Sequence, residues 1–335
     1  MLKEDPKRAL VLSGGGGRGA YHVGVLRFLE EHEWYPDVVV GTSIGAVNGA
    51  ALASGHNANS LWALWRKLRT KDVQKPNWNP FTAVSLLDTS PLRHTLLNEG
   101  WVDFERINDP EKAAVHLRIT ATEITTGQLH IFSNSLNNKT DISVEHILSS
   151  CSIPLIYPHT NLGETKYWDG AVVANTPLSA AIATGAEEII VVVMTPMEQT
   201  QEDQNYRPML PKSLPTNLYE AASMTLEWAL LASFQADMKM FELINSLASI
   251  RDELSKIQAD YPDIVNQYMQ DMNNFVGANV KQDYKRLEKP IIAAPQDFIP
   301  VEQIVSYTKD WHEKLYQMGY DDMKRAWQNA GRVVE

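Results

Sequence analysis

The stretch VVVGTSIG, residues 38–45, joins a valine-rich run to a series of small residues. Val38 to Gly41 is predicted to be a buried strand and Ile44 to Ala53 a helix. Between them lies the pattern G-x-S-x-G, in which Gly41 and Gly45 flank Ser43. A serine on a tight strand-to-helix turn crowds the positions two residues either side of it, so glycine is expected at both. Such a turn holds the hydroxyl clear of the backbone, beside a helix N-terminus that favours negative charge.

The same order of strand and helix continues on both sides of this turn. Alternation of this kind is typical of a largely parallel sheet covered by helices on both faces, so we expect a three-layer α/β/α domain over residues 1–200. The expected strands are Ala9 to Ser13, Val115 to Thr122, Gln128 to Phe132 and Ile189 to Met194, and the expected helices are Tyr21 to Glu30 and Pro177 to Thr184.

The composition changes after residue 200, and we expect residues 201–335 to form a helical C-terminal extension. Glu198 to Pro215 is polar and contains prolines, which predicts a connecting loop or flap. Asn217 to Ile257 contains no proline or glycine and is predicted to form one long helix or two joined helices. Ile304 to Ala330 is predicted to be helical, with an interruption near Gly319.

A stripe of large apolar residues follows helical spacing on the first of these helices, and it has two interpretations. Core packing explains most such stripes. The alternative is an exposed lid or lipid-docking surface beside the active site. The stripe consists of Met224, Trp228, Leu231 and Phe234.

A second glycine-rich turn, SGGGGRG at residues 13–19, also lies between an expected strand and an expected helix. Consecutive glycines leave backbone amides uncovered, so this loop is expected to bind an anion, either a phosphate or the oxyanion of an acyl-transfer intermediate. Its glycines also fit the dinucleotide pattern G-x-G-x-x-G. That interpretation requires an acidic residue at the end of the second strand, but Asp37 precedes the strand. A Walker A loop is also excluded, because Arg18-Gly19 stands where that loop has Lys-Ser/Thr.

The third element is YWDGA, residues 167–171. An aspartate followed by glycine is, taken alone, an ordinary turn former or helix cap. The three elements together, in this order, resemble the patatin-like phospholipases, whose motifs are G-G-G-x-R-G, G-x-S-x-G and D-G-G or D-G-A. The segments SCSIP at 150–154 and ANTPL at 174–178 also resemble this family, and the resemblance covers about residues 8–196.

The resemblance implies a Ser-Asp dyad that needs no cofactor. Ser43 would attack an ester carbonyl and Asp169 would accept its proton. The backbone amides of Gly15, Gly16 and Gly17 would hold the oxyanion, and Arg18 would fix the loop or a lipid phosphate. The sequence departs from the family pattern at Ala171, where glycine is commoner, and at Tyr157-Pro158-His159, where the family often has F-P-P.

A histidine-containing triad is the main alternative chemistry. The usual α/β-hydrolase order places histidine after the acid, whereas His159 precedes Asp169. The later His312 lies among charged residues and is predicted to be a solvated surface residue. Cys151, the single cysteine, is predicted to be a packed apolar residue instead of a nucleophile.

Composition limits the partners. The net charge of −11 argues against nucleic-acid binding and against long-range attraction to anionic membranes, so peripheral membrane contact would depend on local apolar surface. The absence of a long apolar run at the start, and the single cysteine, lead us to expect a cytoplasmic protein. No H-x-x-x-H or clustered carboxylate pattern predicts a metal site.

The expected function is therefore a lipid acyl hydrolase of the phospholipase A or lysophospholipase type. Two alternatives stay open: an esterase or thioesterase of small acyl substrates, and a non-catalytic lipid-binding module.

Overall fold

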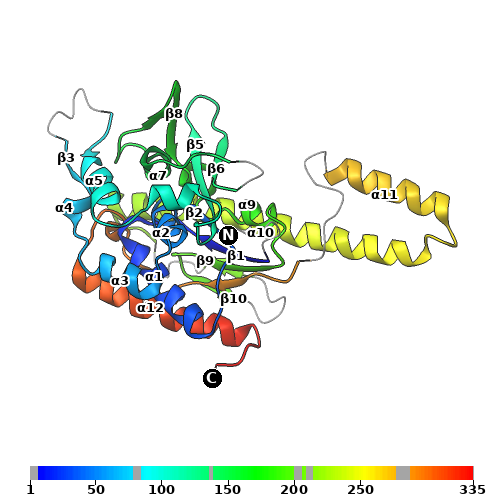
Figure 1. Cartoon of the computed structure of the whole chain (residues 1–335). Coiled ribbons are helices and arrows are strands. Elements are labelled where there is room, and N and C mark those ends of the chain that lie inside the picture. Colours follow the sequence, from blue (N-terminus) through cyan, green and yellow to red (C-terminus); the bar gives the residue numbers. More distant parts are fainter. Residues whose placement is uncertain are drawn as a thin grey trace.

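An eight-stranded mixed sheet runs through the middle of the computed structural model (Figure 1). The structure describes residues 7–77, 84–135, 139–199, 206–208, 214–276 and 287–334. The strand order is β12-β9-β1-β2-β5-β8-β7, with β6 also paired to β5. Neighbours from β12 to β5 are parallel, whereas β6 and β8 run antiparallel to β5, and β7 antiparallel to β8. The strands are β1 (Arg8–Leu12), β2 (Val38–Thr42), β5 (His116–Glu123), β6 (Leu129–Ser133), β7 (Thr160–Leu162), β8 (Thr165–Asp169), β9 (Glu188–Val192) and β12 (Ile291–Ala293).

Alternate residues of the central strands enter two separate cores. Leu10 and Leu12 of β1 join a core with helices α1 (Ala20–Glu31), α2 (Ile44–Ala53), α3 (Ala58–Trp65) and α12 (Lys309–Asn329). Ala9 and Val11 face the other way, toward α9 (Leu178–Ile182) and α10 (Leu218–Ile257). Because strand side chains alternate between faces, both faces of the sheet are apolar and both are covered. The three-layer α/β/α prediction with a mostly parallel sheet is confirmed.

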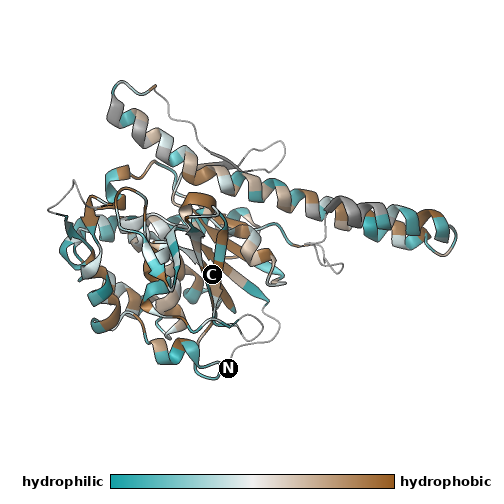
Figure 2. Ribbon diagram, turned by 90° about the horizontal axis from the view of Figure 1, so that it is seen from above, coloured by the Kyte–Doolittle hydropathy of each residue, from teal (hydrophilic) through white to brown (hydrophobic). Residues whose placement is uncertain are grey.

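Helix α10 is one continuous helix of 40 residues. Its middle third lies on the sheet, where Leu231, Phe234, Met238 and Phe241 are buried. The apolar stripe is therefore mainly core there, although Trp228 is 37% exposed. The end of α10 and the whole of α11 (Pro262–Val276) extend beyond the body of the molecule (Figure 1). We call residues 249–276 the arm, and Figure 2 shows hydrophobic residues along it.

The chain after residue 286 departs from the expected helical extension, because it returns to the α/β/α layers. β12 pairs in parallel with β9 and forms an edge of the main sheet. Helix α12 packs along α1 without the interruption expected at Gly319. A Cβ at Gly319 would lie 2.0 Å from the Tyr21 carbonyl oxygen, so this glycine permits a close helix crossing and does not break the helix.

The remaining elements are short. The predicted loop at 198–215 falls largely outside the described residues; its described parts include a two-stranded pairing of β10 (Met197–Gln199) with β11 (Tyr206–Pro208). None of the helices among the described residues has the length and apolarity needed to cross a membrane. The other elements are η1 (Gly16–Gly19), α4 (Thr70–Val73), β3 (Lys75–Pro76), β4 (Leu87–Asp88), α5 (Ser90–Asn98), α6 (Phe104–Asn108), α7 (Val144–Ser150), α8 (Ala171–Ala174) and η3 (Val301–Ile304).

Candidate active site

Ser43 lies on the turn between β2 and α2, in a strained backbone conformation with φ 55° and ψ −124°. A non-glycine residue rarely adopts such angles unless its surroundings hold it there. The Ser43 amide donates a hydrogen bond of 2.8 Å to the Ser150 hydroxyl on α7. Cβ atoms at Gly41 and Gly45 would lie 2.3 and 2.1 Å from the carbonyl oxygens of Gly45 and Leu12, so both positions require glycine. The sequence pattern therefore forms a tight strand-to-helix turn with Ser43 at its apex.

The glycine loop lies directly beside this serine because β1 and β2 are parallel neighbours. Their carboxyl ends meet at the same edge of the sheet, where open α/β sheets bind ligands. A Cβ at Gly14 would be 3.1 Å from the Ser43 Cβ. The Gly14 amide donates to the Asn175 carbonyl at 3.1 Å. Within the described chain, no hydrogen bond uses the amides of Gly15, Gly16 or Gly17.

Asp169 reaches the same edge from the far side of β5. It is the last residue of β8, pairs with Ala121 on β5, and is 1% exposed. Its amide donates to the Ser152 carbonyl at 2.9 Å, and its Oδ1 accepts a 2.8 Å bond from the Ala171 amide. Ala171, which stands where the family more often has glycine, still makes this backbone contact.

The second carboxylate oxygen of Asp169 is available for chemistry. Oδ2 is buried and accepts no aligned hydrogen bond from any described residue. Burial raises the pKa of Asp169 to about 7, while the Ala171 amide and the nearby Ser43 hydroxyl lower it by a smaller amount. A carboxyl with this pKa can take up and release a proton near neutral pH.

The other candidate nucleophile and bases are placed differently. Cys151 is buried, as predicted, and burial together with the nearby Asp169 charge raises the pKa of its thiol well above the usual value. Neither His159 nor His312 is hydrogen-bonded to Ser43 or Asp169 in the described structure. The prediction that His312 is solvated is wrong: it is fully buried, 2.9 Å from the Trp65 carbonyl, and burial lowers its pKa to about 4.

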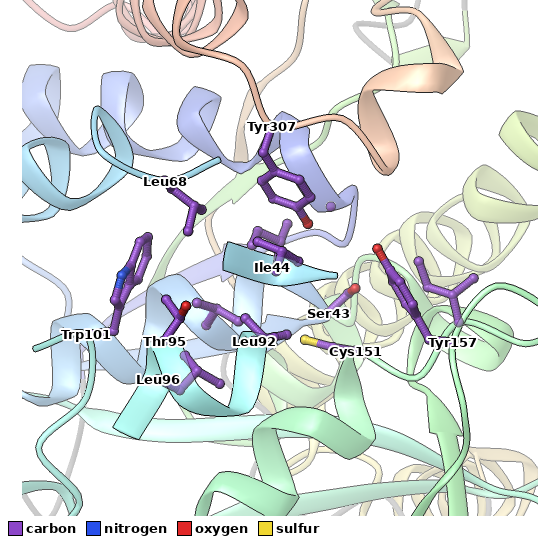
Figure 3. A pocket seen from close by; sticks show the side chains of 14 residues that line it. Ser43, Ile44, Leu68, Leu92, Thr95, Leu96, Trp101, Cys151, Tyr157 and Tyr307 are labelled. Atoms are coloured by element: carbon purple, nitrogen blue, oxygen red, sulfur yellow. The ribbon is translucent and has the colours of Figure 1, made fainter. Parts of the chain in front are cut away.

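A narrow apolar pocket opens from Ser43 (Figure 3). Figure 3 shows Ser43 and Trp101 far apart along it, with Leu92 and Leu96 on one side and Leu68 and Tyr307 on the other. Its free volume is about 20 Å³, room for about one water molecule, because the lining side chains fill it. The lining consists of Gly16, Ser43, Ile44, Val47, Leu68, Val73, Leu92, Thr95, Leu96, Trp101, Cys151, Ile153, Tyr157 and Tyr307.

Sequence reasoning missed the residues that hold this geometry from a distance in the chain. In the sequence, Ser150 stands out only as the first residue of the SCSIP segment, although its hydroxyl accepts the hydrogen bond that holds the Ser43 turn. Tyr307 lies far outside the motifs and still lines the pocket. Arg18 was expected to fix the loop, and its buried guanidinium lies 2.5 Å from Glu227 on α10. No local pattern marks such contacts, because they join segments more than 100 residues apart.

Comparisons to known proteins show what this chain is similar to. The sequence model of the patatin-like phospholipases matches residues 10–182. A lysophospholipase NTE1 from Meyerozyma guilliermondii is 31% identical over 183 residues, 55% of this chain and 12% of that protein. The triacylglycerol lipase ptl3 of Schizosaccharomyces pombe is 30% identical over 173 residues, 47% of this chain and 35% of that protein. The chain thus spans a minor part of the length of these relatives. VipD from Legionella pneumophila matches in structure with a TM-score of 0.45 and 13% identity, over 97% of this chain and 67% of VipD.

The Asp169 environment predicts how Ser43 reactivity depends on pH. Asp169 accepts a proton only when ionised, so labelling of Ser43 by a fluorophosphonate should rise with pH and level off above a midpoint of about 7. The measurement is the second-order labelling rate between pH 5 and pH 9. A midpoint near 4, the value of an exposed aspartate, would show that Asp169 is not the group that titrates.

The same shift predicts a stability difference for Asp169→Asn. A folded-state pKa raised to about 7 means that the wild type loses stability as pH rises from about 4 through 7. Urea unfolding should therefore show the wild type losing about 2–3 kcal/mol relative to the asparagine variant between pH 5 and pH 8. A constant difference across this range would contradict the buried-carboxyl account.

Proposed function

Because this chain belongs to the patatin-like phospholipase family, we propose that it is a serine lipid acyl hydrolase of the phospholipase A or lysophospholipase type. The observation that carries this proposal is the meeting of Ser43, the uncovered amides of the glycine loop and the buried Asp169 at one edge of the sheet. The names of the two relatives, a lysophospholipase and a triacylglycerol lipase, support carboxylic esters of lipids as the substrate class.

The proposed reaction proceeds in two steps. Ser43 Oγ attacks the ester carbonyl while its proton passes to Asp169 Oδ2, the oxygen without an aligned partner. The tetrahedral intermediate collapses, the alcohol leaves with the proton from Asp169, and the acyl group stays on Ser43. Water then gives its proton to Asp169 and attacks the acyl-enzyme. The fatty acid departs, and the proton returns to Ser43.

The amides of Gly15, Gly16 and Gly17 are the proposed oxyanion donors. They are consecutive, have no partner among the described residues, and follow Gly14, where an added Cβ would lie 3.1 Å from the Ser43 Cβ. Fixed amides that face a developing negative charge are worth several kcal/mol of transition-state stabilisation each in a water-excluded site. Arg18, next in the chain, holds this loop in the proposal.

The apolar pocket is the proposed site of the acyl chain. It begins at the nucleophile and is lined mainly by aliphatic and aromatic side chains, so it favours a hydrocarbon over a charged head group. Its small free volume means that lining side chains must move to admit a long chain. The small volume also favours a second candidate function, an esterase of short acyl groups. The preferred acyl-chain length distinguishes these two functions.

Contact with a membrane surface is proposed to occur through the arm. Ile250, Ile257, Ile264 and Tyr268 are all at least 44% exposed there. Isoleucine and tyrosine suit the boundary between head groups and acyl chains. Because the isoleucines are about half exposed, burying each contributes about half of the ~1.5–3 kcal/mol of a fully exposed side chain. With a net charge of −11, the protein gains little from attraction to anionic lipid, so added salt should change this contact little.

The nucleophile is tested by Ser43→Ala. This variant should fold normally and lose hydrolysis of phospholipids and lysophospholipids by at least about a thousandfold, because the activated hydroxyl is gone. Ser246→Ala is the matched control and should keep the activity, because Ser246 is an exposed serine on α10 that does not line the pocket. The measurement is fatty-acid release from a mixed lipid extract. Activity above about one per cent in Ser43→Ala would remove Ser43 from the mechanism.

The acyl pocket is tested by Trp101→Ala. Removing the indole at the end far from Ser43 opens space, so kcat/KM should shift toward longer chains across p-nitrophenyl esters from C2 to C16. Leu97→Ala on α5 is the control, because Leu97 is 48% exposed and does not line the pocket. A profile that peaks at C2 in the wild type and stays unchanged in Trp101→Ala would favour the short-chain esterase.

The membrane proposal is tested by Ile257→Asp combined with Ile264→Asp. Activity on phosphatidylcholine vesicles should fall about tenfold or more, while hydrolysis of a monomeric ester stays unchanged, because the site lies elsewhere. Tyr35→Asp is the control, since Tyr35 is 57% exposed near the amino end of β2, away from the site. Equal activity of both variants on vesicles would show that the arm does not contact lipid.

A further inference from the structure

The glycine loop is enclosed by residues that lie outside the family match. Cβ atoms at Gly16 and Gly17 would lie 1.9 and 2.1 Å from the carbonyl oxygens of Ile304 and Ser306. Tyr307, the next residue, lines the pocket. The backbone between η3 and α12 therefore forms the outer wall of the loop. The proposed oxyanion donors depend on the C-terminal segment for their position.

Arg18 connects this loop directly to two further segments and, through Glu227, to a third. Its side chain is 1% exposed, and its Nη2 lies 2.5 Å from Glu227 Oε1 and 2.9 Å from the Ile299 carbonyl oxygen. Glu227 Oε2 accepts a 3.0 Å hydrogen bond from the hydroxyl of Thr195, just after β9. Both carboxylate oxygens of Glu227 are therefore used, and the carboxylate is fixed between the loop and the sheet.

A buried guanidinium depends strongly on its carboxylate partner. Removing one member of a buried ion pair leaves an uncompensated charge, which is far costlier than losing an exposed pair. Arg18 Nε already has no hydrogen-bond partner among the described residues, so few hydrogen bonds other than those to Glu227 and the Ile299 carbonyl hold the guanidinium. Without Glu227, we expect the guanidinium to move toward water and to displace the loop.

Displacement of Arg18 acts directly on the amides beside Ser43. The Arg18 amide donates to the Gly15 carbonyl at 3.1 Å, which closes the short helical turn that contains Gly16 and Gly17. An oxyanion donor is effective only within a few tenths of an ångström of its position, and a shift of 1 Å costs up to about a hundredfold in rate.

We propose that Glu227 is a positioning residue for the reaction: through Arg18 it holds the oxyanion amides of Gly15, Gly16 and Gly17 in place, although it does not touch the substrate itself. This inference rests on the proposed function. It also means that α10, which packs on the sheet face opposite α1 and α12, supplies a carboxylate on which the reaction depends.

The test compares Glu227→Gln with Glu242→Gln, an exposed glutamate on the same helix. Each variant is assayed at least about 15 °C below its own melting midpoint, so that only folded protein is compared. Glu227→Gln should lower kcat by about 10- to 100-fold and change KM less than about twofold, because the lost stabilisation belongs to the transition state. Fluorophosphonate labelling of Ser43 should slow by a similar factor, and Glu227→Asp should recover part of both rates.

A double-variant cycle shows whether Glu227 acts through Arg18. The variant Arg18→Gln combined with Glu227→Gln should be no slower than Arg18→Gln alone, because the second change has nothing left to displace. An unchanged kcat in Glu227→Gln, a rise in KM alone, or losses that multiply in the double variant would each overturn the inference. Absence of hydrolysis in the wild type would instead refute the proposed function, so the two failures are distinguishable.

Discussion

Parallel pairing of β1 with β2 is the constraint on which the site depends. Ala9 pairs with Val38 and Leu12 with Gly41, so both strands end at the same height in the sheet. Each strand is followed by a glycine-rich turn and a helix, and the two turns are forced into contact there. The close approach leaves no space for a side chain at Gly45, where a Cβ would lie 2.1 Å from the Leu12 carbonyl oxygen, and a Cβ at Gly14 would be crowded by both Ser43 and Asn175. The glycine loop and the strained serine are thus brought to one edge of the sheet by the pairing of two adjacent strands.

Burial then gives the third residue its chemical character. An exposed aspartate at the end of β8 would be ionised throughout the neutral range and would be a weak base. At this edge Asp169 is buried between β5 and the Ser152 backbone, and burial raises its pKa to about 7. One oxygen stays bound to the Ala171 amide, and the other is left without an aligned partner. The same surroundings hold the Cys151 thiol protonated, so two neighbouring groups that could react are separated by their pKa values.

The main strands and the two glycine turns of the first two hundred residues could be predicted because their signals are local, whereas α3, α5, α7 and β7 appear only in the structure. A valine run, a glycine turn and a small-residue helix are each defined within ten residues, and together they specified the layers, the elbow and the loop. The C-terminal part could not be predicted in this way. β12 has only three residues and is a strand because it pairs with β9. The ion pair of Glu227 with Arg18 joins residues 209 positions apart in the chain. His312 lies among charged residues in the sequence, but packing of α12 on α1 and α3 buries it. Tertiary contacts decided each of these cases.

The most direct measurement of the central claim is the identity of the residue that carries the acyl group. The wild type is mixed with a phospholipid bearing an isotope-labelled acyl chain, quenched in acid within one turnover, and analysed by intact mass and peptide mapping. Our account predicts one labelled acyl group, attached to the peptide that contains Ser43. Turnover without any adduct on that peptide, or an adduct on Cys151 instead, would contradict it.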